Sequence, residues 1–435
     1  MGKTHVPRPE HNISRANISE HALKVLYRLK NSGFEACLVG GGVRDLLLER
    51  EPKDFDIATN ATPEQVRKLF RNCRLIGRRF RLAHVHFPGA IIEVATYRGQ
   101  HEGNQGDEGQ IVNGMIVRDN VYGTLEEDAM RRDFTVNSLY YNIQDFSVVD
   151  FVGGLEDLKQ MRLRLIGDPE LRYKEDPVRM LRAIRFAGKL DFTIEPASEE
   201  PIPRLAHLLE DVPPARLFEE VLKLFLAGKA RRNFDLLRQY DLFQILFPQT
   251  DTAINEADSI NFISLLEAAL VNTDKRIAEK KSVTPAFILA IFLWQPVRSL
   301  RKRYLDRGMS PSQALIAASD YVISGQNQRV SLPRRFHTPI RDIWNLQERF
   351  RTRAPKRSFA LIKHPMFRAA YDFLLLRAQA GDENPEMAEW WTQFINADDD
   401  ARAQLLSNAN EGKGKRRRKK RKPKNTSADD SSENN

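Results

Sequence analysis

Two aspartates flank a phenylalanine shortly after a run of three glycines, in the segment "CLVGGGVRDLLLEREPKDFDIATN", residues 37–60. A β-strand turns residues i and i+2 to the same side, about 7 Å apart along the chain. Asp54 and Asp56 are therefore predicted to project together, while Phe55 turns into the core. Two carboxylates held this close repel each other unless a cation lies between them. Such oxygen ligands suit Mg²⁺, which commonly carries phosphate as a further ligand.

The glycines supply a complementary feature, because a ligand can approach backbone N–H groups closely where no Cβ intervenes. Gly40, Gly41 and Gly42 are predicted to form such a turn, with the N-terminus of the next helix facing an anion. Arg44 would add a fork of donors to a phosphate. Two metal ions roughly 3.5–4 Å apart would activate an attacking hydroxyl and stabilise a departing pyrophosphate. The combination therefore favours nucleotidyl transfer. A glycine turn or an Asp-x-Asp pair alone would be common in solvated turns and strands.

Short elements must hold these residues in place, and the first third of the chain alternates between helix and strand patterns. Ser19 is predicted to cap a first helix that Gly33 ends, and Thr62 to cap another with a proline at its first position. A mobile loop is expected over residues 99–114, which contain five glycines. The expected elements are a helix within residues 18–34, strands within 35–39, 54–59, 73–87 and 90–97, helices within 43–49 and 62–70, and a short helix with a hairpin within 124–154.

Strand patterns fade beyond Leu155, and the segments that follow have helical periodicity. The segment "KGKRRRKKRKPK", residues 413–424, carries ten Lys and Arg and no acid, which equals the whole net charge of +10. Such a block cannot bury apolar surface and is expected to stay disordered. We interpret it as a nucleic-acid arm; a solubilising or membrane-surface tail is the alternative.

Four segments between residues 37 and 190 carry a family resemblance: "LVGGGVRDLLL", "KDFDIATNATPEQV", "RRDFTVNSLYYN" and "EDPVRMLRAIRFAGKL". They resemble the successive motifs of the tRNA nucleotidyltransferase/poly(A) polymerase family. Residues 75–87 and the basic tail resemble the bacterial poly(A) polymerase branch more than the CCA-adding branch. The resemblance implies an α+β chain with a polymerase β-like mixed-sheet head. Its implied parts are a catalytic head at 19–154, an α-helical neck with base recognition at 155–240, an RNA-binding helical body at 241–405 and a disordered basic tail at 406–435.

The resemblance also implies catalytic and metal-binding roles for Asp54, Asp56 and Asp133, with Asp133 as the third carboxylate. It makes Arg132 a nucleotide-contacting residue. The alternative is that residues 126–133, "EEDAMRRD", form a solvated helix face with i, i+4 ion pairs.

A second implied group lies in "EDPVRMLRAIRF", where the resemblance assigns base selection to Glu175, Asp176 and Arg179. Arg182 and Arg185 would then support the nucleotide. Helical geometry places the three arginines in one arc, with steps of about 60°. The alternatives are a helix cap at Asp176 and a solvated face for the arginines.

The sequence thus predicts an enzyme that adds AMP from ATP to RNA 3′ ends with Mg²⁺, or Mn²⁺ in its place, and releases pyrophosphate. RNA-decay proteins are expected as partners. One alternative is a CCA-adding tRNA nucleotidyltransferase; another is a catalytically silent RNA-binding protein on the same scaffold. Deleting residues 412–435 is expected to weaken RNA binding while leaving the chemistry of short primers nearly intact.

The composition also limits where in the cell the protein is expected. Two cysteines, Cys37 and Cys73, cannot build a disulfide framework, and residues 1–18 lack an apolar core. The longest apolar run, at 286–294, is far shorter than the roughly 20 residues of a membrane-spanning helix. A soluble, cytoplasmic protein is the expectation.

Two other patterns stay open. Arg78, Arg79 and Arg81 would contact RNA phosphates or lie solvated on the surface. His84 and His86 share a strand face, which would suit a metal, but no third ligand is near them in sequence and a structural role is favoured.

Overall fold

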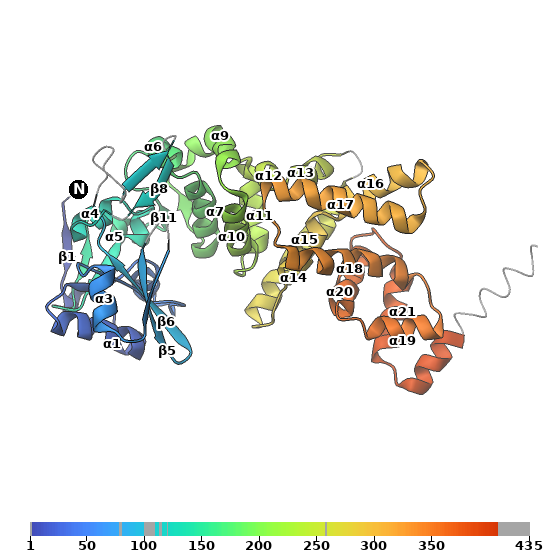
Figure 1. Cartoon of the computed structure of the whole chain (residues 1–435), viewed down its shortest axis with the longest axis horizontal. Helices are drawn as coiled ribbons and strands as arrows, with labels where there is room; N and C mark the ends of the chain where they lie inside the picture. The colour runs from blue at the N-terminus through green and yellow to red at the C-terminus, as the bar shows by residue number, and fades with distance from the viewer. Residues whose placement is uncertain are drawn as a thin grey trace, which may run out of the picture. The chain divides into compact units, whose positions relative to one another are not determined.

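The computed structural model describes residues 2–77, 81–99, 109–112, 115–119, 121–256 and 259–407. The chain divides into two compact units, Met1–Leu246 and Phe247–Asn435. The first begins with a mixed sheet and the second is helical (Figure 1). The finer division of the first unit into a head at 19–154 and a neck at 155–240 stays a prediction.

An eight-stranded sheet forms the framework of the first unit, in the order β1-β10-β9-β2-β3-β6-β5-β4. Strands β3 and β6 run parallel, and every other neighbouring pair in this sheet is antiparallel. This confirms the predicted mixed α/β character. Edge strand β1 was not predicted. The strands are β1 Thr4–Val6, β2 Ala36–Val39, β3 Asp56–Thr59, β4 Cys73–Ile76, β5 Leu82–Phe87, β6 Ala90–Thr96, β9 Leu139–Asn142 and β10 Val148–Asp150.

Helices α1 (Glu20–Asn31) and α3 (Pro63–Leu69) contact each other and the sheet (Figure 1). The Ser19 side chain accepts a hydrogen bond from the Ala22 N–H at 3.1 Å, and Gly33 follows the helix with φ 85°. A capping box between Thr62 and Gln65 begins α3. These ends confirm the predicted caps, because each uses the side chain that the sequence offers for an unpaired N–H.

The predicted loop at 99–114 is partly wrong. Residues Gly109–Val112 form strand β7, which pairs antiparallel with β8, Met115–Asp119. Residues 100–108 and 113–114 lie outside the described residues, as do Arg78 and Arg79. The glycine content misled the prediction, because a hairpin of two strands can satisfy its own backbone without packing large side chains.

The rest of the first unit is mostly helical and centres on α7, Val178–Leu190, which contacts α10 (Pro214–Phe225) and α11 (Ala230–Gln239). A short parallel pair, β11 (Arg162–Leu163) and β12 (Thr193–Ile194), was not predicted. The other elements here are α2 Gly41–Leu47, α4 Leu125–Met130, α5 Gly154–Lys159, α6 Pro169–Glu175, α8 Pro196–Glu199, α9 Pro201–Leu205 and α12 Leu242–Leu246.

The second unit has its own aromatic core. Trp344 and Phe350, which lie in the arginine-rich segment 334–357, are fully buried. Its helices are α13 Pro248–Ile254, α14 Ile260–Ala278, α15 Pro285–Phe292, α16 Trp294–Asp306, α17 Pro311–Arg329, α18 Arg334–Phe350, α19 Pro355–Ile362, α20 Phe367–Gln379 and α21 Pro385–Asn396. Most of the predicted tail, residues 408–435, lies outside the described residues.

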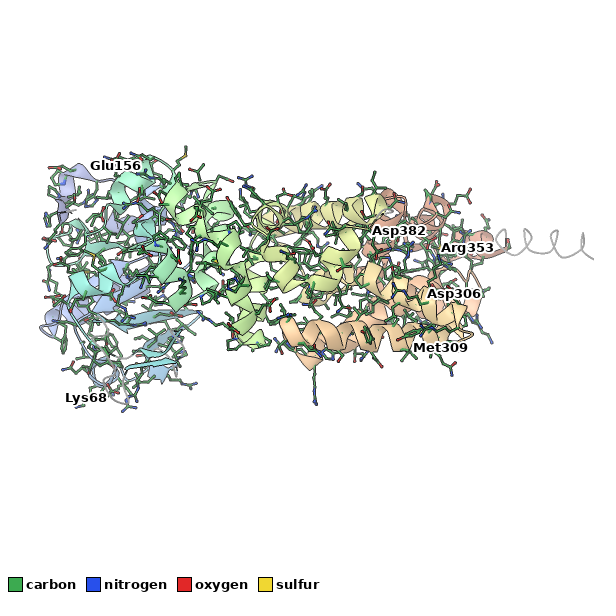
Figure 2. The ribbon with its side chains drawn as sticks, turned by 90° about the horizontal axis from the view of Figure 1, so that it is seen from above. Lys68, Glu156, Asp306, Met309, Arg353 and Asp382 are labelled. Carbon is green, nitrogen blue, oxygen red and sulfur yellow. The ribbon has the colours of Figure 1, made fainter. Side chains whose placement is uncertain are left out.

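Charged side chains also brace this unit. Figure 2 labels Asp382, whose carboxylate accepts a hydrogen bond from Arg377 Nε at 2.7 Å. Arg377 is 3% exposed and lies over the ring of Trp294. Within the described ranges, every helix is too short or too polar to cross a membrane.

Candidate nucleotide and metal site

The glycine turn after β2 lies between Arg132 on one side and the segment of Asp54 on the other. Gly40 has φ 71°, and a Cβ added there would lie 3.6 Å from Arg132 Nη1. A Cβ on Gly42 would lie 3.3 Å from the backbone oxygen of Asp54. The positive φ favours glycine at Gly40, and the close approach of the Asp54 backbone favours it at Gly42.

Asp56 is the first residue of β3, and Asp54 precedes the strand, so the strand geometry predicted for both holds only from Asp56 onward. Both side chains reach solvent. The parallel register pairs Ile57 with Val94, which sets Asp56 beside Glu93 on β6. Burial, followed by the charge of Glu93, raises the pKa of Asp56 to about 6; Arg132 opposes the rise and Asp54 adds to it. Three carboxylates thus concentrate negative charge at this point of the sheet.

A cavity of 1080 Å³ opens on these carboxylates. His84 on β5 lies across from Glu93 in the antiparallel register, with its Nε2 atom 3.3 Å from Glu93 Oε1. The rings of His84 and His86 are 6.3 Å apart. The lining includes Lys53, Asp54, Asp56, His84, His86 and Glu93.

Asp133 does not join this group. Its Oδ2 accepts from Arg182 Nε at 2.7 Å and also from Arg182 Nη2, and its Oδ1 accepts from the Phe134 N–H at 2.7 Å. Although burial disfavours its charge, Arg182 lowers the pKa of Asp133 to about 2. Among the described residues, no three His, Cys, Asp or Glu side chains are arranged to hold a metal ion. An arginine from α7 therefore pairs with the Asp133 carboxylate, and the convergence of Asp133 with Asp54 and Asp56 stays a prediction.

Arg132 lies where a nucleotide-contacting residue is expected. Its Nε and Nη2 atoms donate to Asp128 Oδ2 at 3.0 and 2.9 Å, and Nε also donates to the Tyr140 hydroxyl at 2.9 Å. Burial works against its charge, but Asp128 and Tyr140 raise its pKa. These bonds fix the guanidinium with its Nη1 atom toward Gly40.

The arginines of α7 face carboxylates from other segments. Arg179 Nη1 donates to Glu175 Oε2 at 3.0 Å, and Arg185 Nε lies 3.6 Å from Glu220 Oε2. Arg182 pairs with Asp133, so each of the three arginines of the predicted basic arc has an acidic partner outside α7. The solvated-face alternative is therefore wrong, since Arg179 is 9% exposed.

Asp176 lies between α6 and α7, where it is the C-cap residue of α6, and Pro177 is the N-cap residue of α7. Asp176 Oδ1 accepts from the Val178 N–H at 3.3 Å, and its Oδ2 accepts from Arg216 Nη2 at 2.7 Å. Glu175 also accepts from Arg172 Nη1, at 2.7 Å. Of the predicted base-selecting residues, Glu175 and Arg179 are thus paired with each other, whereas the Asp176 carboxylate pairs with Arg216.

Arg44 lies on α2, the helix that follows the glycine turn. It is 1% exposed, and its Nε and Nη2 donate to Asp45 Oδ1 while Nη1 donates to the Asn137 side chain. Its Nη2 atom lies 3.4 Å from the position of a Cβ on Gly41, so the buried guanidinium braces the glycine turn, and contact with a phosphate stays a prediction.

Glu93 is the residue that sequence reasoning missed. The segment "AIIEVATY" was identified as a strand, and Glu93 is its single acid. The signal was the parallel pairing of this strand with the aspartate strand, which depends on a long-range contact and cannot be read from local pattern.

Three family models match the chain. They are described as the poly A polymerase head domain, at residues 36–164, a probable RNA and SrmB-binding site of polymerase A, at 191–254, and the polymerase A arginine-rich C-terminus, at 307–425.

Bacterial poly(A) polymerases are similar to this chain over most of its length. The chain is 53% identical to poly(A) polymerase I of Salmonella typhimurium, over 90% of this chain and 85% of the relative. It is 46% identical to poly(A) polymerase I of Haemophilus influenzae, over 93% and 90%. The CCA-adding enzyme of Lactobacillus helveticus is 38% identical over only 49% of this chain and 52% of that enzyme.

Solved structures share the fold. The Thermotoga maritima CCA-adding enzyme in complex with tRNA aligns with a TM-score of 0.58 at 21% identity, covering 90% of this chain and 85% of that one. A tRNA-processing enzyme in an apo form aligns with a TM-score of 0.61 at 21% identity, covering 93% and 98%.

Proposed function

The chain belongs to the bacterial poly(A) polymerase family, and on that premise we propose how its residues add AMP to RNA 3′ ends. It is a template-independent polynucleotide adenylyltransferase. The CCA-adding enzymes are more distant relatives, because their similarity covers only about half of the chain.

Asp54, Asp56 and Glu93 are proposed to hold Mg²⁺, or Mn²⁺ in its place. The support is chemical: burial first, and then the charges of Glu93 and Asp54, raise the pKa of Asp56 to about 6. A divalent cation relieves this repulsion, and oxygen donors are the ligands that it prefers. When bound, the metal supplies activation of the RNA 3′ hydroxyl and neutralises charge on the departing pyrophosphate.

The triphosphate of ATP is proposed to lie against the turn at Gly40 and Gly41, with Arg132 donating to it. Asp128 and Tyr140 hold the Arg132 guanidinium in place, so little conformational entropy is lost on binding. Arg44 contributes indirectly by fixing the turn.

Glu175, Asp176 and Arg179 are proposed to select adenine by hydrogen bonds to its edge. Arg182 and Arg185 flank the ring of Phe186, with guanidinium-to-centroid distances of 5.3 and 4.5 Å. We propose that they support the nucleotide, and that Asp133 acts by holding Arg182 rather than by binding metal.

RNA is the proposed second substrate, supported by the match at 191–254 to a probable RNA-binding site. RNA-decay proteins as partners and a cytoplasmic location are proposals of the same kind. The observation that carries the proposed mechanism is the placement of Asp56 beside Glu93, next to the cavity that Asp54 also lines.

Primer extension with single nucleotides tests the activity. Purified protein, Mg²⁺ and a 5′-labelled RNA primer are incubated with ATP, CTP, GTP or UTP separately. We expect a long ladder with ATP and little extension with the others. Addition that stops after C, C and A on a tRNA lacking its terminus would support the CCA-adding alternative, and no incorporation at all would support a silent RNA-binding protein.

A further inference from the structure

A second cavity, of 350 Å³, lies within the helical unit between the start of α13 and one face of α17. It is lined by Pro248, Gln249, Tyr321, Ser324, Gly325, Gln328 and Arg329. The lining combines apolar surface with polar side chains, those of Gln249, Ser324 and Gln328 among them.

Tyr321 supplies an aromatic face at this cavity. Its side chain is 65% exposed, although a phenol ring buries much apolar surface when a partner is available. Ser324 and Gln328 follow at helical spacing on the same side of α17 and are also exposed. A planar ring beside small polar side chains is the arrangement on which unpaired nucleobases stack.

Gln249 is held at a fixed angle beside this ring. Its Nε2 atom donates to the backbone oxygen of Val322 at 3.2 Å. A Cβ on Gly325 would lie 2.7 Å from that nitrogen, so a larger residue at this position of α17 would displace the Gln249 amide. Because the carbonyl of Val322 can only accept, the amide orientation follows from the chemistry.

This orientation leaves recognition groups on Gln249. Within the described part of the chain, no donor reaches its Oε1 atom, and the second hydrogen of Nε2 is unused. A glutamine amide pairs with adenine by accepting from N6 and donating to N7. Uracil offers no exocyclic amine and cannot make this pair.

We propose that this pocket binds an unpaired adenine base of RNA, stacked on Tyr321 and paired with Gln249. The inference rests on the proposed function in that RNA is the substrate, and it adds a recognition site for adenylate residues already in the RNA. Adenine is the proposed occupant because the Tyr321 ring can stack on a base and the Gln249 amide can pair with the edge of adenine.

Equilibrium binding of fluorescent 20-nucleotide oligo(A) and oligo(U) to the full chain, without ATP, tests the pocket. Tyr321→Ala should weaken oligo(A) binding at least about fivefold, since stacking is lost. Tyr321→Phe should bind within about twofold of wild type, because the ring remains. Gln249→Met should lower the preference for oligo(A) over oligo(U).

Ile316→Ala is the matched control, because Ile316 is 54% exposed on the same helix and does not line the cavity. Equal binding by Tyr321→Ala and Ile316→Ala would overturn the proposal, as would a Tyr321→Phe variant as weak as Tyr321→Ala or an unchanged preference in Gln249→Met. Competition by millimolar AMP in wild type but not in Tyr321→Ala would assign the pocket to free nucleotide instead. If wild type incorporates no AMP, the proposed function fails, while this binding comparison still decides the pocket.

Discussion

Two groups of carboxylates in the first unit have opposite electrostatic surroundings. Asp54, Asp56 and Glu93 lie together on the sheet, and the pKa of Asp56 rises to about 6 through burial and its acidic neighbours. Asp133 lies against α7, where Arg182 lowers its pKa to about 2 despite burial. The charge of Arg132 opposes the rise at Asp56 without reversing it, whereas Arg182 outweighs burial at Asp133. The difference supports the proposal that the sheet carboxylates bind metal and that Asp133 positions Arg182.

The largest expected effect follows from Asp56→Asn. We expect the rate of AMP incorporation to fall by roughly 10³-fold, because metal stabilisation of the transition state is worth several kcal/mol. Single-turnover primer extension with ATP measures it. Removing a repelled charge should leave the thermal unfolding midpoint equal to that of wild type or higher, so a large drop in that midpoint would show that Asp56 is structural instead.

Glu93→Gln should have the next largest effect, a loss of about 10- to 100-fold in activity or metal affinity. Titration of activity with Mg²⁺ should show a higher half-saturating concentration than in wild type. His84→Gln provides a comparison, because it changes the neighbour of Glu93 and leaves the carboxylate. Activity of Glu93→Gln equal to wild type at every Mg²⁺ concentration would remove Glu93 from the metal site.

Asp133→Asn should act mainly on stability. Removing one partner of a largely buried ion pair leaves Arg182 uncompensated, at a cost of about 2 kcal/mol in the free energy of unfolding, since Arg182 retains partial exposure. Urea denaturation at pH 7 measures this. The Mg²⁺ dependence of activity should not change; a shift as large as that of Glu93→Gln would contradict the assignment.

The smallest expected effect is the pH dependence of the stability that the Asp133–Arg182 ion pair contributes. The pKa of Asp133 is lower in the folded chain than its ordinary value, so its stabilising contribution is fully present above about pH 4 and is lost as pH falls toward 2. The stability difference between wild type and Asp133→Asn should therefore shrink between pH 4 and pH 2. A constant difference over that range would mean that the ion pair is not its source.

Local pattern predicted much of this unit, because caps, strand alternation and the glycine turn are short-range features. Ser19, Thr62 and the placement of Asp56 on a strand follow from neighbouring residues alone. The burial of Arg44 could not be predicted in this way, because its partner Asn137 is distant in sequence.

Partners that are distant in sequence also explain why Glu93 was not predicted to lie beside Asp56. Asp133 and Glu93 could not be distinguished by type or spacing, since only tertiary contacts bring Arg182 to one and Asp56 to the other. The sequence could therefore not show which acid lies beside Asp56, and the proposal of Glu93 as a metal ligand depends on the tertiary structure.

Direct metal binding tests the central claim most sharply. Electron paramagnetic resonance of Mn²⁺ titrated into wild type, Asp56→Asn, Glu93→Gln and Asp133→Asn reports bound ion without requiring turnover. The account predicts that Asp56→Asn and Glu93→Gln bind Mn²⁺ weakly, whereas Asp133→Asn binds it like wild type. Loss of Mn²⁺ in Asp133→Asn with retention in Glu93→Gln would contradict it.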